Sequence, residues 1–230
     1  MKVDHTLMNS FLAKNITDKK ADDYCATSIE SPIRSDAFNL PDEEKIKHIT
    51  YHFKKIMHTL GLDLNDDSLK NTPGRVAKMY VKEVFAGLNP TNKPDITLFN
   101  NKYQYNEMLI EKNITLYSYC EHHFVPIIGK VHVAYYSKGY VIGLSKLNRL
   151  VQYYANRPQV QERLTIQIAE AIKEAVQSED IAVVIDAEHL CVSSRGIKDT
   201  NTSTITSNYS GRFRNEKSKL EFLTLINSSR

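Results

Sequence analysis

The sequence predicts an α+β fold in which helices cover one face of an antiparallel sheet. Apolar residues recur at three- and four-residue steps, the spacing of amphipathic helices, over 42–60, 73–84, 145–156 and 159–177. Alternating or continuously apolar runs, typical of strands, lie at 108–119, 127–137, 140–142, 181–187 and 200–209. Helices and strands come in groups instead of alternating strictly, which favours α+β over a parallel α/β sheet.

The first 107 residues divide into two expected regions. Residues 1–40 are polar and lack a sustained period, so we expect a flexible leader. A helical part over 41–107 follows, because Pro41 and three acidic residues open its first helix and Gly61 ends it. A second helix starts with Thr72 as N-cap and Pro73 at the first helical position, and ends near Gly87.

Residues 108–230 form the expected sheet domain. The turn at Lys138-Gly139 predicts a β-hairpin between 127–137 and 140–142. Ser145 is expected to cap the next helix, and Pro158 separates that helix from the longest one. The last segment is expected to close the core through its apolar residues, which are Leu220, Phe222, Leu223 and Ile226.

Composition indicates a globular protein, with 41% hydrophobic and 25% charged residues in 230. The net charge of +3 is too small to indicate a nucleic-acid partner. Three cysteines, a low and odd number, point to a reducing cytoplasm instead of a secreted disulfide framework. No apolar run approaches the roughly 18 residues of a membrane span, and no signal peptide is recognisable. We therefore expect a cytoplasmic protein that binds neither nucleic acid nor membrane.

A candidate metal site lies in the stretch Cys120-Glu121-His122-His123. A cysteine and a histidine three residues apart can close on one zinc ion in a tight loop. Cys191 follows a strongly apolar run and supplies a second sulfur. Three protein ligands (Cys120, His123 and Cys191) leave a coordination position for water, the catalytic arrangement. The alternative is that Cys191 is a small core hydrophobe, as a cysteine at a strand end commonly is.

Anion-binding candidates are scattered, because the chain has no glycine-rich phosphate loop. Ser145-Lys146-x-x-Arg149 places two cations on one face at a helix start, where backbone N–H groups favour an anion. Arg195 follows the Cys191 loop. Each of the three basic residues is, taken alone, an ordinary surface cation; together beside a zinc loop they favour a phosphate role.

Base recognition and proton transfer have two candidates each. Gln161 and Glu162 open the longest helix, and an amide beside a carboxylate suits a guanine edge. A solvated first turn with a favourable helix dipole is the alternative for Glu162. His122 and His189 neighbour the proposed ligands and titrate near neutrality, so they suit proton transfer. The alternative for either is a histidine that supports the site or the core.

Five motifs, in order, resemble those of the GTP cyclohydrolase I family. They are CEHHFVP at 120–126, GKVHVAY at 129–135, VIGLSKL at 141–147, RPQVQERLT at 157–165 and HLCVSSRG at 189–196. TPGRVAKM at 72–79 resembles the helical N-terminal part of that family. The resemblance runs from about residue 42 to 227 and is specific as a set.

The resemblance implies a zinc-dependent hydrolase that opens the imidazole ring of GTP, releases formate and gives 7,8-dihydroneopterin triphosphate, the first step of tetrahydrofolate and pterin biosynthesis. Its fold would be the T-fold, with residues 108–230 as a zinc-containing catalytic domain assembled into a homodecamer with sites between subunits. By this resemblance, Cys120, His123 and Cys191 would bind zinc, and Gln161 and Glu162 would bind guanine. The triphosphate would be bound by Lys146, Arg149 and Arg195. Proton transfer would fall to His122 and His189, with Ser145 near the ribose. Arg75 would face Glu121.

Three departures from the family pattern stand out: Val192 where Met is common, Gly74 where a longer residue is common, and 215–220 without the expected Arg. They concern local packing or regulation. Two other functions remain as alternatives. One is an NADPH-dependent nitrile reductase of the same T-fold, with a nucleophilic cysteine and no catalytic zinc. The other is a non-catalytic zinc module that holds an assembly together.

Overall fold

The computed structural model describes residues 29–228, so most of the predicted leader lies outside the described residues. Its helices are α2 (Asp42–Thr59), α3 (Thr72–Met79), η1 (Tyr80–Val84), η2 (Ala86–Leu88), η3 (Pro90–Asn92), α4 (Leu144–Ala155), α5 (Gln161–Val176), α6 (Leu190–Ser193), η4 (Gly211–Arg214) and α7 (Glu216–Asn227). Its strands are β1 (Leu98–Asn100), β2 (Met108–Cys120), β3 (Pro126–Tyr136), β4 (Tyr140–Ile142), β5 (Pro158–Gln159), β6 (Ile181–His189) and β7 (Thr204–Tyr209). None of the helices within 29–228 is long and apolar enough to cross a membrane.

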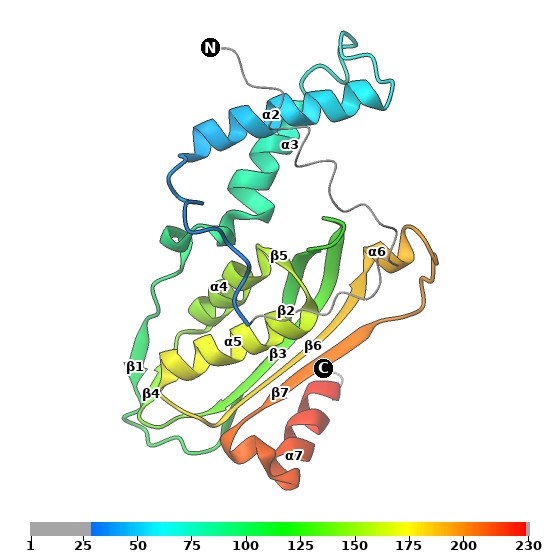
Figure 1. The fold of residues 1–230 in the computed structure, drawn as a ribbon. Helices are drawn as coiled ribbons and strands as arrows, with labels where there is room; N and C mark the ends of the chain where they lie inside the picture. Colours follow the sequence, from blue (N-terminus) through cyan, green and yellow to red (C-terminus); the bar gives the residue numbers. More distant parts are fainter. Residues whose placement is uncertain (1–28, 229–230) are drawn as a thin grey trace.

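The two N-terminal helices pack against each other above one end of the sheet (Figure 1). The second predicted helix is interrupted, since α3 ends at Met79 and the chain continues through one π-helical turn and a 3₁₀ turn. Gly87 lies in that 3₁₀ turn, where a Cβ would come within 2.0 Å of the Tyr153 carbonyl oxygen, so only glycine lets the turn pack on α4. A Cβ at Gly74 would meet nothing within 4 Å, and this departure from the family pattern therefore disturbs no packing.

A five-stranded sheet in the order β5-β2-β3-β6-β7 forms the body of the molecule. All neighbours in it are antiparallel except β2 and β5. The central strands β3 and β6 pair over nine residues, from Ile127 with His189 to Tyr135 with Ile181. This register brings the start of β3 beside the end of β6, where the candidate metal ligands lie.

The predicted hairpin between 127–137 and 140–142 is wrong. Strand β4 pairs instead with β1 in a separate two-stranded sheet, with Leu98 opposite Ile142. The physical reason is that β2 and β6 already occupy both edges of β3, which leaves β4 no partner in the main sheet.

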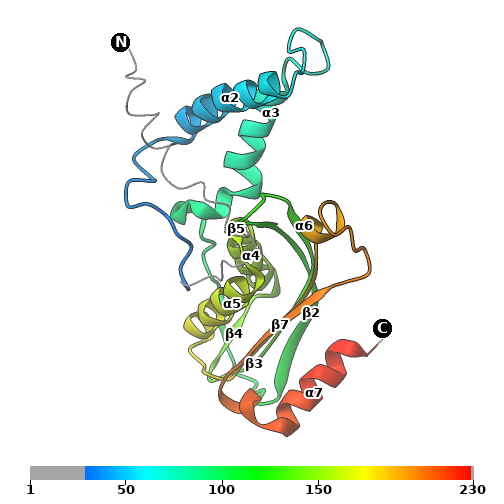
Figure 2. The ribbon, with the colours of Figure 1, turned by 45° about the vertical axis from the view of Figure 1, so that its right-hand side comes forward.

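Helices α4 and α5 cover one face of the sheet, as expected, and bury residues such as Leu150, Leu164 and Ile168 against Val131 and Val133. The opposite face is partly covered by η4 and α7 (Figure 2). Their contribution to this second core is mainly Phe213 and Phe222, both fully buried. Of the four apolar residues expected to close the core, Leu220 was predicted wrongly, because 67% of it is exposed on the outer side of α7.

Part of the predicted leader is described and packs on the body. Gln167 of α5 donates a side-chain hydrogen bond to the Ile29 carbonyl oxygen over 2.8 Å. Arg157 donates to the Ser31 hydroxyl over 3.5 Å, and Ser31 is buried. The division of the chain at residues 40 and 107 stays a prediction.

Candidate metal centre

The loop between β2 and β3 holds the first candidate ligands in a closed turn. Cys120 ends β2, and its N–H donates to the Val125 carbonyl oxygen while its own carbonyl accepts from the Phe124 N–H. Phe124 adopts a positive φ of 53° and stacks edge-to-face on Phe85 at 5.0 Å between ring centroids. The loop is therefore anchored both to its own strand ends and to the N-terminal helical part.

Strand β6 delivers the second sulfur to this loop. His189 ends β6 opposite Ile127, and Cys191 follows two residues later in α6. The ligand atoms of Cys120, His123 and Cys191 all lie within 4.8 Å of one another. The three predicted metal ligands are thus brought together, in a group that could hold a metal ion.

The donor set fits zinc in both type and spacing. Cys120 Sγ lies 3.9 Å from His123 Nδ1, close to the roughly 3.6 Å that separates sulfur and nitrogen ligands around a tetrahedral zinc. Burial, together with the neighbouring Cys120 thiol, raises the pKa of Cys191 above its ordinary value. A cation bound between the sulfurs would reverse this effect, because metal ligation favours the thiolate. The cysteines of the described chain are free thiols, as such a site requires.

His189 is held by the first residue of α5. Its Nε2 lies 2.7 Å from the Gln161 side-chain oxygen. Burial lowers the pKa of His189, and the nearby Glu162 carboxylate acts in the opposite direction. Gln161 is buried with its amide nitrogen bonded to protein acceptors, whereas Glu162 is exposed. The predicted guanine contact is therefore available from the Glu162 side chain but not from that of Gln161 as it stands.

Glu121 is buttressed from α5. Arg163 Nη1 donates to Glu121 Oε2 over 2.5 Å, and the arginine side chain is only 4% exposed. On the other side of Glu121, His122 Nε2 lies 3.9 Å from Oε1. This arrangement differs from the one implied for Arg75, which is exposed on α3 in the described chain. Glu121 therefore faces Arg163 within one chain.

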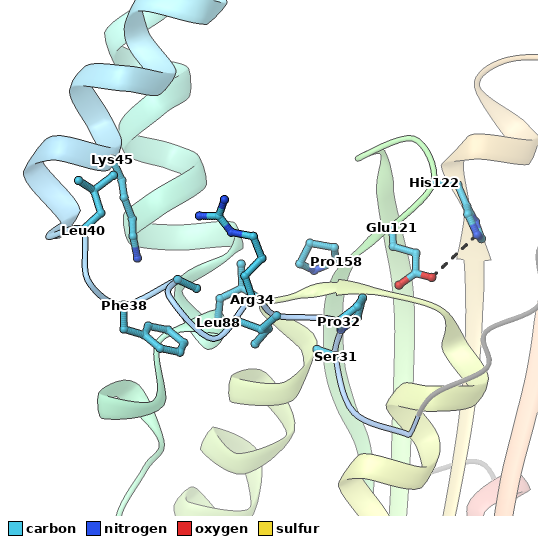
Figure 3. Close-up of a pocket in the computed structure, with 12 residues that line it drawn as sticks. Ser31, Pro32, Arg34, Phe38, Leu40, Lys45, Leu88, Glu121, His122 and Pro158 are labelled. Atoms are coloured by element: carbon cyan, nitrogen blue, oxygen red, sulfur yellow. Dashed lines mark ion pairs between the residues drawn. The ribbon is translucent and has the colours of Figure 1, made fainter. Parts of the chain in front are cut away.

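A cavity of about 580 Å³ opens beside this loop. Figure 3 shows Glu121 and His122 at one end of it, with Pro158, Leu88, Lys45 and the 31–40 segment forming the rest of the wall. Its lining includes neither Cys191 nor His189, so the cavity adjoins the metal group from the side of the N-terminal segment.

The predicted phosphate ligands separate into two places. Arg195 lies at the metal group, with Nη1 3.0 Å from His123 Nε2. The start of α4 holds Ser145, Lys146 and Arg149. The other end of this helix lies near the metal group, because the Ser118 hydroxyl, two residues before Cys120, donates to the Ala155 carbonyl oxygen. Ten residues of helix separate the two ends by about 15 Å. One chain therefore does not bring Ser145 and Lys146 to the metal group.

Sequence reasoning missed three residues that shape the centre: Arg163, Phe124 and Thr206. Arg163 was a charged residue in a first helical turn, where solvent exposure is the default expectation. Thr206, which bonds the Gln161 amide, was one of several threonines in a strand. Their partners lie about 40 residues away, and no local pattern marks such pairs.

Comparisons with known proteins agree on one family. A family model described as GTP cyclohydrolase I matches residues 49–227. GTP cyclohydrolase 1 from Flavobacterium johnsoniae is 56% identical over 93% of this chain and 96% of its own length. GTP cyclohydrolase 1 from Salmonella gallinarum is 50% identical over 87% and 91%, and that from Pasteurella multocida is 52% identical over 78% and 83%.

Among solved structures, the apo form of an archaeosine synthase QueF-Like matches 45% of this chain and 93% of its own, with 19% identity and a TM-score of 0.39. The antiparallel sheet with paired helices is the T-fold arrangement that the sequence resemblance implied, and neither alternative function is favoured by these relatives. Because the family model matches residues 49–227 and several relatives share half or more of the aligned residues, the chain belongs to the GTP cyclohydrolase I family.

Proposed function

We propose that this protein hydrolyses GTP at the imidazole ring of guanine, releasing formate and forming 7,8-dihydroneopterin triphosphate. The observation that carries the proposal is the convergence of Cys120, His123 and Cys191 in a chain 56% identical to a GTP cyclohydrolase 1. The overall reaction consumes one water: two are added as the ring opens and formate leaves, and one is lost when the new ring closes.

The three ligands are proposed to hold zinc, with two thiolates and one imidazole as the donor set. Zinc bound there would lower the pKa of a coordinated water toward neutrality and so supply the nucleophile. The chain contributes the geometry, because the closed loop after β2 and the end of β6 fix the donors before any ion binds.

Glu162 is proposed to recognise guanine, since a carboxylate can accept from the ring N–H and the exocyclic amino group together. The guanine carbonyl needs a donor, and the first N–H groups of α5 have no partner within the helix. Gln161, the other predicted guanine ligand, would have to exchange its protein hydrogen bonds to make this contact.

The triphosphate is proposed to lie between subunits. Arg195 is at the metal group, while Ser145 and Lys146 lie about 15 Å and Arg149 about 9 Å from the end of α4 that reaches the metal side. A neighbouring copy that presents its α4 start to this metal group would complete the site. A homodecamer with shared sites is the assembly we propose on this ground and on family resemblance.

His122 and His189 are proposed as the proton-transfer pair. His189 would take up a proton released by the attacking water and pass it to the guanine ring nitrogen as the ring opens. His122, beside Glu121, would move protons at the opposite side of the ring. Ser145 would serve the later rearrangement of the ribose. Free thiols at the site fit the reducing cytoplasm, and a pterin or folate pathway would use the product.

The test is incubation of the purified protein with GTP, with and without a zinc chelator. We expect one formate per GTP consumed and a pterin that becomes fluorescent on oxidation. Both products should be lost with the chelator and restored by added zinc. NADPH consumption with a nitrile substrate would support the reductase instead. Chelation that dissociates subunits of a protein with no GTP turnover would support the zinc module.

A further inference from the structure

The side-chain amide of Gln161 has an orientation fixed by its surroundings. Its nitrogen lies 2.8 Å from the Thr204 carbonyl oxygen, 3.2 Å from the Ile185 carbonyl oxygen and 3.1 Å from the Thr206 hydroxyl. Backbone carbonyls only accept hydrogen bonds, so the amide nitrogen must face them. The reversed amide would set its oxygen against two other oxygens in a site where Gln161 is 1% exposed.

Two threonine hydroxyls close a directed ring around this amide. Thr165 Oγ1 donates to the Gln161 backbone carbonyl over 2.8 Å. Because its proton is used there, Thr165 accepts from Thr206 across their 2.7 Å contact. Thr206 has then spent its own proton and can only accept from the Gln161 amide. All three groups around this atom can therefore only accept a hydrogen bond, so the atom that faces them must be the amide nitrogen.

The amide oxygen is left facing His189. Its distance to Nε2 is 2.7 Å, and an amide oxygen can only accept. His189 Nε2 must therefore carry a proton, which places the lone pair of the neutral ring on Nδ1. A second group that fixes the tautomer of a catalytic imidazole is the arrangement by which an aspartate directs the histidine of a hydrolase triad.

We propose that Gln161 is a positioning residue, held by Thr206 and Thr165, that keeps His189 in the Nε2–H tautomer so that Nδ1 alone exchanges protons with the substrate. The identity of the substrate in this inference rests on the proposed function, whereas the tautomer of His189 follows from the hydrogen bonds alone. It assigns the Gln161 side chain to His189 instead of to guanine, and it adds Thr206 to the residues on which the site depends.

The kinetic test replaces Gln161 with Met, which has a similar length and no hydrogen bonds. We expect kcat to fall on the order of 10- to 100-fold with KM for GTP within about twofold, as for loss of a residue that supports a catalytic group. Gln167→Met is the matched control, since Gln167 is also buried in α5 and bonds Ile29 and the Gln159 side chain. This control should lower stability and leave kcat unchanged. A raised KM with unchanged kcat in Gln161→Met would show a guanine contact and overturn the proposal.

Two conservative substitutions of Thr206 test the same inference in case Gln161→Met does not fold. Thr206→Val keeps the side-chain shape and removes one acceptor, and we expect kcat to fall several-fold; Thr206→Ser retains the hydroxyl and should restore it. Thr204→Val is the control on the same strand, because Thr204 is exposed and contributes only its backbone carbonyl. Equal activity of the Val and Ser variants at 206 would contradict the proposed ring.

The tautomer itself is measured by ¹⁵N NMR of histidine-labelled protein, with His189→Gln identifying the signals. The expected result is a neutral His189 ring protonated at Nε2 in the wild type and a mixture of tautomers in Gln161→Met. A wild-type ring protonated at Nδ1 would overturn the inference, whatever the enzyme turns over. Lack of GTP hydrolysis by a wild type with the expected tautomer would instead refute the proposed function and leave the positioning intact.

Discussion

Arg163 and Glu121 form an ion pair that joins the start of α5 to the metal loop, with 2.5 Å between Nη1 and Oε2. The pair is shielded, since the side chains are 4% and 20% exposed. Removing one partner of a buried pair leaves an uncompensated charge and costs on the order of 3–5 kcal/mol. We therefore expect Arg163→Met to lower the free energy of unfolding by about 3 kcal/mol in denaturant titrations at fixed protein concentration.

A surface pair on the same helix provides the control for Arg163. Lys173 bonds Glu170 over 2.8 Å, but Glu170 is 55% exposed. Exposed pairs contribute about 0–1 kcal/mol, so Lys173→Met should change stability by no more than that. If both variants lose the same free energy of unfolding, the ion pair at the metal loop contributes no more to stability than a surface pair.

The buried His132 predicts loss of stability in mild acid. It is 8% exposed, and its Nδ1 accepts from the Asn113 N–H over 3.4 Å. Burial lowers its pKa; Asp186 on β6 acts in the opposite direction, and Lys130 and Lys112 act in the same direction. The unfolded chain therefore binds a proton near pH 6.5 that the folded chain resists, and stability falls as the pH drops below about 6.5 toward the folded pKa.

Replacing His132 with Gln should remove this contribution. We expect the thermal midpoint of the variant to fall less than that of the wild type between about pH 7.5 and about pH 5.5. His48→Gln, at an exposed position on α2, should behave as the wild type. Parallel curves for wild type and His132→Gln would show that His132 does not resist protonation in the fold.

Glu162 predicts selectivity for the guanine edge. A glutamine there accepts fewer hydrogen bonds, so Glu162→Gln should reduce kcat/KM for GTP on the order of 10- to 100-fold. Inosine triphosphate (ITP) lacks the exocyclic amino group, so its kcat/KM should fall less than that of GTP. The ratio of kcat/KM for GTP to that for ITP should therefore decrease in the variant. Glu170→Gln, at an exposed position in the same helix, should leave the ratio unchanged. An unaltered GTP-to-ITP ratio in Glu162→Gln would remove Glu162 from base recognition.

Arg195 predicts a phosphate contact next to the metal. It bonds His123 Nε2 and belongs to the segment after Cys191. A charge-assisted bond to phosphate is worth about 1.5–3 kcal/mol, so Arg195→Ala should raise KM for GTP on the order of 10- to 100-fold. Inhibition by guanosine, which has no phosphate, should change little. Arg212→Ala, an exposed arginine paired with Asp180, is the control, and equal weakening of guanosine and GTP would point to a lost fold instead of a lost phosphate contact.

The convergence of the three candidate metal ligands was predictable from the sequence because two of them are local. Cys120 and His123 share one turn, and Cys191 follows an apolar run that had to be a central strand. What placed Cys191 was the pairing of Ile127 with His189, a consequence of sheet order that no local pattern encodes. The α+β class and most helices followed from periodicity for the same reason, since each depends on residues close in sequence.

What the sequence did not indicate correctly are partners that depend on the whole fold. The turn at Gly139 looked like a hairpin turn, yet β4 pairs with β1 because β3 has no free edge. Nothing in the sequence marked Arg163, yet its side chain is buried and forms an ion pair with Glu121. The guanine contact of Gln161 stays a prediction, and the sequence did not indicate that its amide nitrogen is bonded to carbonyl groups of β6 and β7. In each case the deciding neighbour lies tens of residues away.

The proposed hydrolysis requires Cys191 as a metal ligand beside a free coordination position. The decisive measurement is zinc content together with formate release from GTP in Cys191→Ser, with Cys25→Ser as control because Cys25 is the cysteine of the sequence that the proposed ligand set leaves out. We predict about one zinc per chain and full turnover in the wild type and in Cys25→Ser, and loss of both in Cys191→Ser. A Cys191→Ser protein that keeps its zinc and releases formate at the wild-type rate would contradict the account.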